Sequence, residues 1–256
     1  MNSLIKLSSF FLAWLLFVYS CSEENSTNPP GDENLPVYFP NSEGTFYKYE
    51  IIQTDTNGII STGIRNVDYL EDTLINSTRY KLQIDSIQIN LQLSVSSSYF
   101  RTTETGVFYF VDTTGFTNTL PELFQSSVEL QDEMRAYLFP LSEGTFWPVY
   151  RISVELNESL SFNIVNITGK YISDETLILD GIQTVNTKKV EIVFKLQTDT
   201  DDSVITFNAN TWLAEDIGIV KMEGNAVVLS LFSGSELDLS DTSITETQNL
   251  IYYDVK

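Results

Sequence analysis

Apolar and polar residues alternate over most of the chain beyond residue 36. The clearest alternation runs through Val190, Ile192, Phe194 and Leu196, and it resumes at Ile205, Phe207 and Ala209. A period of two residues is typical of a strand with one buried face. Turn sequences such as Asn57-Gly58 and Asp180-Gly181 separate runs of this kind and are typical of β-hairpins. The pattern therefore predicts an all-β fold built from antiparallel strands.

The alternation changes phase once within an otherwise regular run. Apolar residues occupy the even positions Tyr80, Leu82 and Ile84, and then the odd positions from Ile87 onward. A β-bulge or a tight bend at Asp85-Ser86 would move apolar side chains from one face of a strand to the other. We therefore expect such a break there.

Residues 120–136 are the one stretch with loosely helical spacing, since Leu123, Phe124, Val128 and either Leu130 or Met134 could share a helix face. We expect one short helix in this connection. Residues 149–256 contain no proline, which suits a sheet whose central strands must donate every backbone amide.

An eight-residue segment occurs twice in the chain. Residues 39–46 read FPNSEGTF and residues 139–146 read FPLSEGTF, which gives seven identities in eight positions at an offset of 100 residues. Proline fixes the backbone before a turn, glycine can adopt positive φ, and the aromatic residue after it begins a strand. The two copies predict two repeats of one curved antiparallel β unit, over residues 36–119 and 138–256, joined by the connection at 120–137.

The first 21 residues resemble a bacterial lipoprotein signal peptide. A weakly basic start is followed by an apolar run from Leu7 to Val18, and Ser20 precedes Cys21, the one cysteine of the chain. The run is shorter than the roughly 20 apolar residues of a membrane-spanning helix. Val18 and Ser20 match a lipobox, whereas Tyr19 is bulkier than is usual at its position. The resemblance implies cleavage after residue 20, acylation of Cys21 and a membrane anchor, with residues 1–20 removed.

The segment after Cys21 is polar and acidic. Residues 22–35 read SEENSTNPPGDENL, and such a composition has too little apolar surface to fold alone. We expect residues 21–35 to form a disordered tether. Its Ser-Glu-Glu opening resembles the export signal that sends some lipoproteins to the outer cell surface, so we expect an outer-membrane location, on the periplasmic or the cell-surface face.

Charge and residue types exclude several kinds of function. Without residues 1–20 the chain has 13 basic and 35 acidic residues, a formal charge of −22, so we expect no nucleic-acid partner. Histidine is absent, which excludes Ser-His-Asp and Cys-His catalysis and the usual zinc sites. Carboxylate, lysine or tyrosine chemistry remains open, as does calcium binding through oxygen ligands. We expect no cofactor.

Two groups of acidic residues are the candidates for chemistry. Glu43 and Glu143 are equivalent in the repeated segment and could form a carboxylate pair. Glutamate in a Pro-x-Ser-Glu-Gly turn is, however, most simply a solvated residue. Asp199, Asp201 and Asp202 could hold calcium, but no glutamate follows at loop spacing, so a solvated hairpin tip is favoured. We predict no catalytic residue and no metal site.

Aromatic residues are abundant enough for a carbohydrate platform or a lipid-lined cavity. They are Trp147, Trp212, Tyr99, Phe100, Phe108, Tyr109, Phe110, Tyr252 and Tyr253. Because none stands apart from the strand periodicity, ordinary packing within the sheet is favoured for them.

Three features of the chain carry a family resemblance: the repeated segment, the alternating strands, and Thr211-Trp212-Leu213 leading into residues 218–221 (GIVK). Together they resemble β-rich envelope lipoproteins with domains similar to the open half-barrel of the LolA/LolB-like carriers. The resemblance spans residues 36–233. It implies a curved antiparallel sheet whose concave face can hold an apolar ligand, and a carrying or sensing role without catalysis. The chain departs from the carriers in its internal duplication and in the lack of an obvious plug helix.

These observations predict a lipid-anchored, non-enzymatic binding or structural protein of the cell envelope. Its partners would be the membrane, through the acyl anchor, and a protein, glycan or lipid ligand. The main alternative is a carrier or sensor of an apolar, lipid-like ligand. A third class, a carboxylate-based glycan hydrolase, requires two acids beside aromatic residues in one groove, and the sequence places no such pair together.

Overall fold

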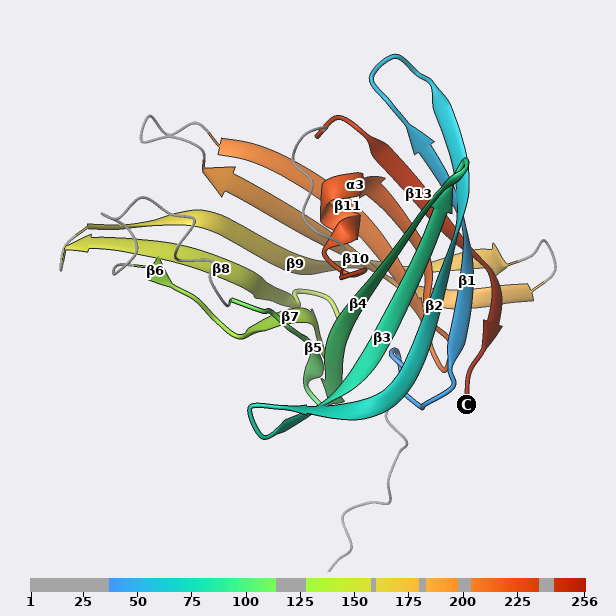
Figure 1. Ribbon diagram of the computed structural model, residues 1–256, viewed down its shortest axis with the longest axis horizontal. Helices are drawn as coiled ribbons and strands as arrows, with labels where there is room; N and C mark the ends of the chain where they lie inside the picture. Colours follow the sequence, from blue (N-terminus) through green and yellow to red (C-terminus); the bar gives the residue numbers. More distant parts are fainter. Residues whose placement is uncertain (1–36, 114–127, 158–159, 180–182, 198–203, 235–241) are drawn as a thin grey trace, which may run out of the picture. The chain divides into compact units, whose positions relative to one another are not determined.

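The computed structural model describes residues 37–113, 128–157, 160–179, 183–197, 204–234 and 242–256. These residues form one antiparallel sheet of 13 strands that does not close, together with one short helix (Figure 1). The all-β prediction is therefore confirmed. Among the described residues, no helix has the length and the apolar character required to cross a membrane.

The strands follow in two series. The first comprises β1 (Phe46–Thr54), β2 (Ile60–Ile75), β3 (Thr78–Ile89), β4 (Gln92–Thr103), β5 (Gly106–Phe110) and β7 (Glu133–Leu138). The second comprises β8 (Phe146–Asn157), β9 (Leu160–Leu179), β10 (Gln183–Gln197), β11 (Val204–Ala214), β12 (Gly218–Asn225) and β13 (Thr245–Asp254). The short strand β6 (Val128–Glu129) and the helix α3 (Ala226–Ser230) lie outside these two series.

The duplication appears directly in the topology of the sheet. Its order is β6-β8-β9-β10-β11-β12-β13-β1-β2-β3-β4-β5-β7, so each series is a six-stranded meander and the second continues into the first. The last strand of the second meander, β13, pairs along the whole of β1. The two repeats therefore share one continuous sheet.

The two copies of the repeated segment form the same turn. Thr45 N donates to Ser42 O at 3.2 Å, and Thr145 N donates to Ser142 O at 3.0 Å. Each threonine carbonyl also accepts from the second strand of its meander, Thr45 O from Tyr69 N at 2.9 Å and Thr145 O from Tyr171 N at 3.0 Å. The turn therefore fixes the position of the first strand against the second in both repeats.

Gly44 and Gly144 occupy the positive-φ position of these turns, at φ 79° and 83°. A Cβ at Gly144 would have no atom within 4 Å, and one at Gly44 would approach only Lys256 Cγ, at 3.7 Å. We therefore expect Gly44→Ala and Gly144→Ala each to lower the free energy of unfolding by about 1 kcal/mol, through the backbone alone. Denaturant unfolding of each variant tests this, and two unchanged midpoints would contradict it.

The inner face of the sheet packs around α3 and the residues that follow it. Val227, Val228 and Leu229 of the helix are buried. Beyond it, Phe232 packs against Tyr109 and Tyr137 of the first repeat, with ring centroids 6.2 and 6.1 Å apart. A segment of the second repeat thus packs against the first repeat.

The helix expected within residues 120–136 is wrong in its described part. Residues 128–129 form β6 and residues 133–138 form β7. The apolar residues of this stretch fit a period of two as well as a helical one, because Met134 and Ala136 are buried and Arg135 between them is not. The observed helix lies at α3 instead.

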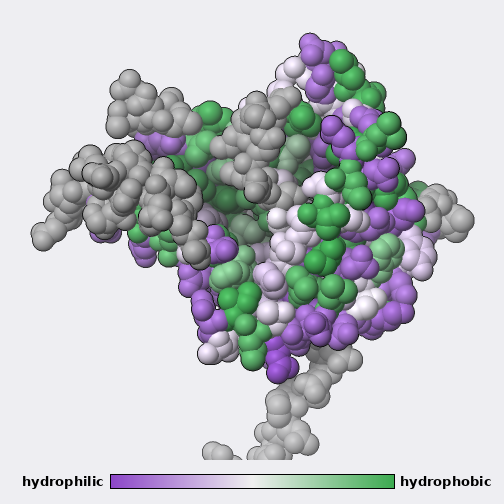
Figure 2. All heavy atoms as spheres, viewed as in Figure 1, coloured by the Kyte–Doolittle hydropathy of each residue, from purple (hydrophilic) through white to green (hydrophobic). Residues whose placement is uncertain are grey.

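The expected break at Asp85-Ser86 is also wrong. β3 pairs with β4 in unbroken register from Lys81 to Ile89. The inner face of β3 is polar at this point, since Gln83 and Asp85 are buried, and Leu82 and Ile84 therefore lie on the opposite, outer face. Figure 2 shows apolar side chains interrupting the polar surface over this part of the sheet, where β4 exposes Leu93 and Val95.

Candidate functional site

The acidic residues that the sequence singled out do not form a site in the described structure. Glu43 and Glu143 are exposed on their turns, and five strands separate β1 from β8 in the sheet. Cys21 and the three aspartates Asp199, Asp201 and Asp202 lie outside the described residues. Within the described ranges, no three Cys, Asp or Glu side chains gather as metal ligands would.

A different site lies where the sheet fails to close. β7 ends the sheet on one side, and β8 lies near its other end. β9 pairs with one edge of β8, and on the other edge the two-residue β6 pairs at Ser153 and Val154. We call the space between β7 and residues 146–152 of β8 the seam. Two side chains of β8 bridge it: Trp147 Nε1 donates to Arg135 O at 3.1 Å, and Tyr150 Oη donates to Gln131 O at 2.9 Å.

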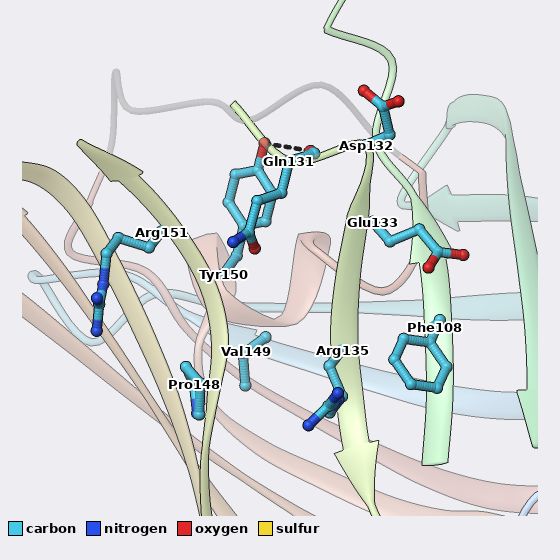
Figure 3. A pocket seen from close by; sticks show the side chains of 9 residues that line it. All are labelled: Phe108, Gln131, Asp132, Glu133, Arg135, Pro148, Val149, Tyr150 and Arg151. Atoms are coloured by element: carbon cyan, nitrogen blue, oxygen red, sulfur yellow. Dashed lines mark hydrogen bonds between the residues drawn. The ribbon is translucent and has the colours of Figure 1, made fainter. Parts of the chain in front are cut away.

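The seam contains a cleft of about 500 Å³, which we call the seam cleft. Residues 131–133 and Arg135 line it on the β7 side, residues 148–151 line it on the β8 side, and Phe108 of β5 extends the first wall (Figure 3). The volume is within the range of small-ligand sites, roughly 300–1,000 Å³. Val149 and Tyr150 are buried, whereas Pro148 and Arg151 are exposed, so the cleft is closed at the first two residues and open to solvent at the other two.

One of the arginines near this cleft is already neutralised. Arg101 Nε and Nη2 donate to the two carboxylate oxygens of Glu133 at 2.6 and 2.7 Å. Tyr80 Oη also donates to Glu133, at 2.6 Å. Chiefly because of the Arg101 hydrogen bonds, the pKa of Glu133 is lowered from its usual value. Glu133 is thus an ionised, fully engaged carboxylate.

The two arginines that line the cleft have no such partner. In the described part of the chain, neither Arg135 nor Arg151 forms an ion pair or a side-chain hydrogen bond. The guanidinium of Arg135 lies over the Phe108 ring, 5.2 Å from its centroid, and Arg101 lies 4.4 Å from the same centroid. In Figure 3 the carboxylates of Asp132 and Glu133 point away from Arg135. Two unneutralised cations therefore flank the cleft of a strongly acidic protein.

The Glu133 ion pair gives a pH prediction. A carboxyl group with a folded-state pKa below its unfolded value stabilises the fold above the unfolded pKa, and this contribution is lost as pH falls through the folded pKa. We expect Glu133→Gln to lower the melting temperature at pH 7 and to have little effect near pH 3. Thermal melts of wild type and variant across this range measure the difference, and a difference that stays constant with pH would contradict the assignment.

A second, more apolar depression lies elsewhere on the sheet. The end of the β9–β10 hairpin lies beside β12 and β13, and two adjoining pockets of about 130 and 370 Å³ form between them. Leu179 and Leu250 line both pockets. Gln183 and Tyr253 join the two sides through contacts of 3.4 Å. This depression offers packing surface, without an unpaired charge to orient a ligand.

Sequence reasoning missed the residues that form the seam cleft. The sequence pattern favours packing for Phe108 and gives no signal for Arg135 or Arg151. Each is an isolated residue on its own strand, and only the fold brings the three together. The sequence offers one weak signal for this site. Basic residues are scarce in this chain, so a basic residue without an acidic partner among the described residues is a candidate for ligand binding.

No protein-family model matches the sequence, and no curated protein matches it either. Two solved structures are similar to this chain. A candidate lipoprotein from Parabacteroides distasonis is 13% identical, with a TM-score of 0.47, and covers 87% of this chain and 100% of its own. A candidate exported protein with a YmcC-like fold from Bacteroides fragilis is 14% identical, with a TM-score of 0.45, and the match covers 86% of this chain and 100% of its own. At these values neither likeness assigns a family or a function.

Proposed function

We propose that this protein is a lipid-anchored, non-enzymatic binding protein of the bacterial envelope, anchored through Cys21 in the outer membrane, and that it binds its ligand in the seam cleft. The observation that carries the binding site is the pair of arginines, Arg135 and Arg151, that line a cleft of ligand size and have no acidic partner among the described residues. An arginine in an acidic protein would gain a carboxylate partner at little cost, so two without one favour an external anion.

The local structure holds Arg135 ready for such a ligand. Its backbone carbonyl accepts from Trp147 Nε1, and its guanidinium lies against Phe108. Arg101, which lies over the same ring, is held in place by its hydrogen bond to Glu133. Stacking and hydrogen bonding reduce the side-chain freedom that binding would otherwise have to remove.

Binding without catalysis fits the chemistry of the cleft. A general acid or base needs a carboxyl group poised to exchange a proton near the working pH. Glu133 is instead held ionised by Arg101 and Tyr80. The chain has no histidine, and its one cysteine is the acylation site in this proposal.

An apolar-ligand carrier is less well supported by the packing. The inner face of the sheet holds fully buried large side chains from both repeats, among them Phe100, Phe194 and Phe232. α3 lies over the same face and contacts β10, β11, β12 and β13. A lipid-like ligand would have to displace these side chains, whereas the seam cleft needs no rearrangement.

Two measurements test the proposal. Cys21→Ser should abolish palmitate labelling and membrane sedimentation, and a labelled variant would overturn the anchor.

For the site, thermal melts of the full mature chain with inorganic phosphate, glucuronate and poly-glutamate should show stabilisation by at least one of them. That shift should be lost in Arg135→Ala/Arg151→Ala and retained in the control Arg79→Ala, whose exposed arginine lies elsewhere, 3.8 Å from Asp72. Stabilisation that persists in the double variant would place the site elsewhere.

A further inference from the structure

We propose that the ligand of the seam cleft is an extended acidic polypeptide segment of a partner protein, which binds as an additional strand along the free edge of β7. This inference rests on the proposed function, because it names the class of ligand for the same cleft. Two independent features of the described residues carry it: the unpaired backbone N–H and C=O of Glu133 on β7, and the arginines without an acidic partner on both walls.

The backbone of β7 directs alternate residues into the seam. Asp132 O accepts from Val111 N at 2.9 Å, on the side of β5. Since successive residues of a strand direct their N–H and C=O groups to opposite sides, residues 131, 133 and 135 direct theirs to the seam. The side-chain bonds agree, because Tyr150 reaches Gln131 O and Trp147 reaches Arg135 O.

Glu133 lies between these two occupied carbonyls. Among the described residues, no group bonds to its N–H or C=O on the seam side. A strand edge with unpaired backbone groups is a template for a further strand, and strand addition is a common mode of peptide recognition. An incoming segment can therefore pair with Glu133 in the register of a seventh strand of the first meander.

The charges of the cleft select the kind of segment. A strand added to β7 places its side chains next to those of β7, where cross-strand neighbours interact directly. Arg135 then lies beside the segment on one wall, and Arg151 of β8 lies on the opposite wall. In Figure 3 the two guanidinium groups are on different strands and are well separated. An extended segment with more than one acidic residue meets both, whereas a single small anion meets one.

A second copy of this chain is a poorer occupant. Its own β7 would bring another Arg135, while its Glu133 is already engaged by Arg101 and Tyr80. Each copy also carries a large negative charge, which opposes association. An acidic segment from a different protein supplies the missing carboxylates without adding a further unpaired arginine.

The test uses phage-displayed random nonapeptides selected on the full mature chain in detergent micelles. We expect enriched peptides with acidic residues at alternate positions, and Arg135→Ala or Arg151→Ala should each raise their Kd about tenfold or more. The charge-reversed protein Arg135→Glu/Arg151→Glu should select basic peptides instead, and this change of preference shows that the variant is folded. Arg79→Glu, at the exposed arginine elsewhere, should select the same acidic peptides as wild type.

Backbone pairing is tested on one enriched peptide by N-methylation at successive amides. Methylation of the one amide that donates to Glu133 O should abolish binding, and methylation of its neighbours should not, because the carbonyls of Gln131 and Arg135 already accept from Tyr150 and Trp147. Binding that tolerates every methylation, or enrichment of peptides without acidic residues, would overturn the strand model.

The outcomes also separate this inference from the proposed function. If glucuronate or phosphate stabilises the protein through Arg135 and Arg151 but no peptide is enriched, the peptide assignment is wrong and the anion site stands. If neither small anions nor peptides bind, both proposals fail. A concentration-dependent dimer in sedimentation equilibrium that dissociates in the charge-reversed variant would make a second copy the occupant and overturn the inference.

Discussion

Replacing Arg65 with methionine should lower the free energy of unfolding by about 3–5 kcal/mol, the range expected when one partner of a buried ion pair is removed. Arg65 and Asp85 are 3% and 0% exposed, and Arg65 Nε lies 2.5 Å from Asp85 Oδ1. Without the arginine, the Asp85 carboxylate would keep one hydrogen bond, from Gln83 Nε2 at 2.6 Å. A buried carboxylate with no counter-charge must be desolvated without compensation or take up a proton.

The same arginine joins parts of the chain that are far apart in sequence. Arg65 Nη1 donates to Gln248 Oε1 at 2.9 Å, and Nη2 donates to Phe232 O at 3.2 Å. Gln83 Nε2 also donates to Phe232 O, at 3.0 Å. The segment after α3 is thus held against the first repeat by polar bonds as well as by ring packing, and Arg65→Met should loosen it. Hydrogen exchange at residues 226–234 measures this effect.

The pH dependence of this variant has a defined sign. Burial raises the pKa of Asp85 above its usual value, against the lowering effect of Arg65. In Arg65→Met that lowering is lost, so the folded-state pKa rises further. A carboxyl group of this kind stabilises the fold below its unfolded pKa, and the contribution is lost as pH rises through the folded pKa. The destabilisation by Arg65→Met should therefore be larger at pH 7 than at pH 4.5.

Two controls accompany the measurement. Arg79→Met, at an exposed arginine beside Asp72, should change stability by less than about 1 kcal/mol. The double variant Arg65→Met/Asp85→Leu should recover much of the loss, because a buried ion pair replaced by apolar groups is often neutral in stability. An Arg65→Met protein as stable as wild type at both pH values would contradict the assignment.

The features that could be predicted from sequence are those set by local physics. The strands follow from the two-residue period in β10 and β11, and the turns at Gly44 and Gly144 follow from proline, serine and glycine in a fixed order. Both depend on neighbouring residues only. The repeated segment predicts two units, and each copy of it leads directly into the first strand of a six-stranded meander.

The features that could not be predicted depend on residues distant in sequence. Gln83 and Asp85 read as solvent-facing because they are polar, yet they are buried, with Arg65 of β2 bonded to Asp85 and Phe232 O, after α3, bonded to Gln83. Leu82 and Ile84 consequently mark the outer face of β3, whereas Ile87 and Ile89 share the face of Gln83 and Asp85, and the phase of the pattern misleads. Buried polar residues of this kind violate the binary pattern on which sequence interpretation rests.

The seam cleft has the same origin. Its walls come from β5, β7 and β8, and no short motif joins Phe108, Arg135 and Arg151. That the arginines are unpaired becomes visible only when the positions of all the acidic side chains are known. That the chain is a binding protein of the envelope stays a prediction from sequence, whereas the position of the proposed site depends on where the sheet fails to close.

Trp147→Ala should have an effect of similar size at the seam itself, lowering the free energy of unfolding by about 3–5 kcal/mol. Trp147 is 1% exposed and is among the largest fully buried side chains of the described core. It packs on Gly169 of β9, where an added Cβ would lie 2.3 Å from two indole carbons. The alanine variant therefore loses a large buried surface and leaves a cavity, and it also loses the bond from Nε1 to Arg135 O.

A matched set of variants separates packing from the bridge across the seam. Trp147→Phe removes the Nε1 donor and leaves Arg135 O without its partner, so it should cost less than Trp147→Ala and should increase hydrogen exchange along β7. Gly169→Ala should be strongly destabilising alone, because its Cβ would overlap the indole, yet it should cost little in the Trp147→Leu background, which makes room for the methyl group. Calorimetric unfolding of wild type, Gly169→Ala, Trp147→Leu and the double variant gives the coupling free energy between the two positions directly. If the two substitutions are additive, Trp147 does not pack on Gly169, and a Trp147→Phe protein with unchanged hydrogen exchange along β7 would contradict the bridge to Arg135 O.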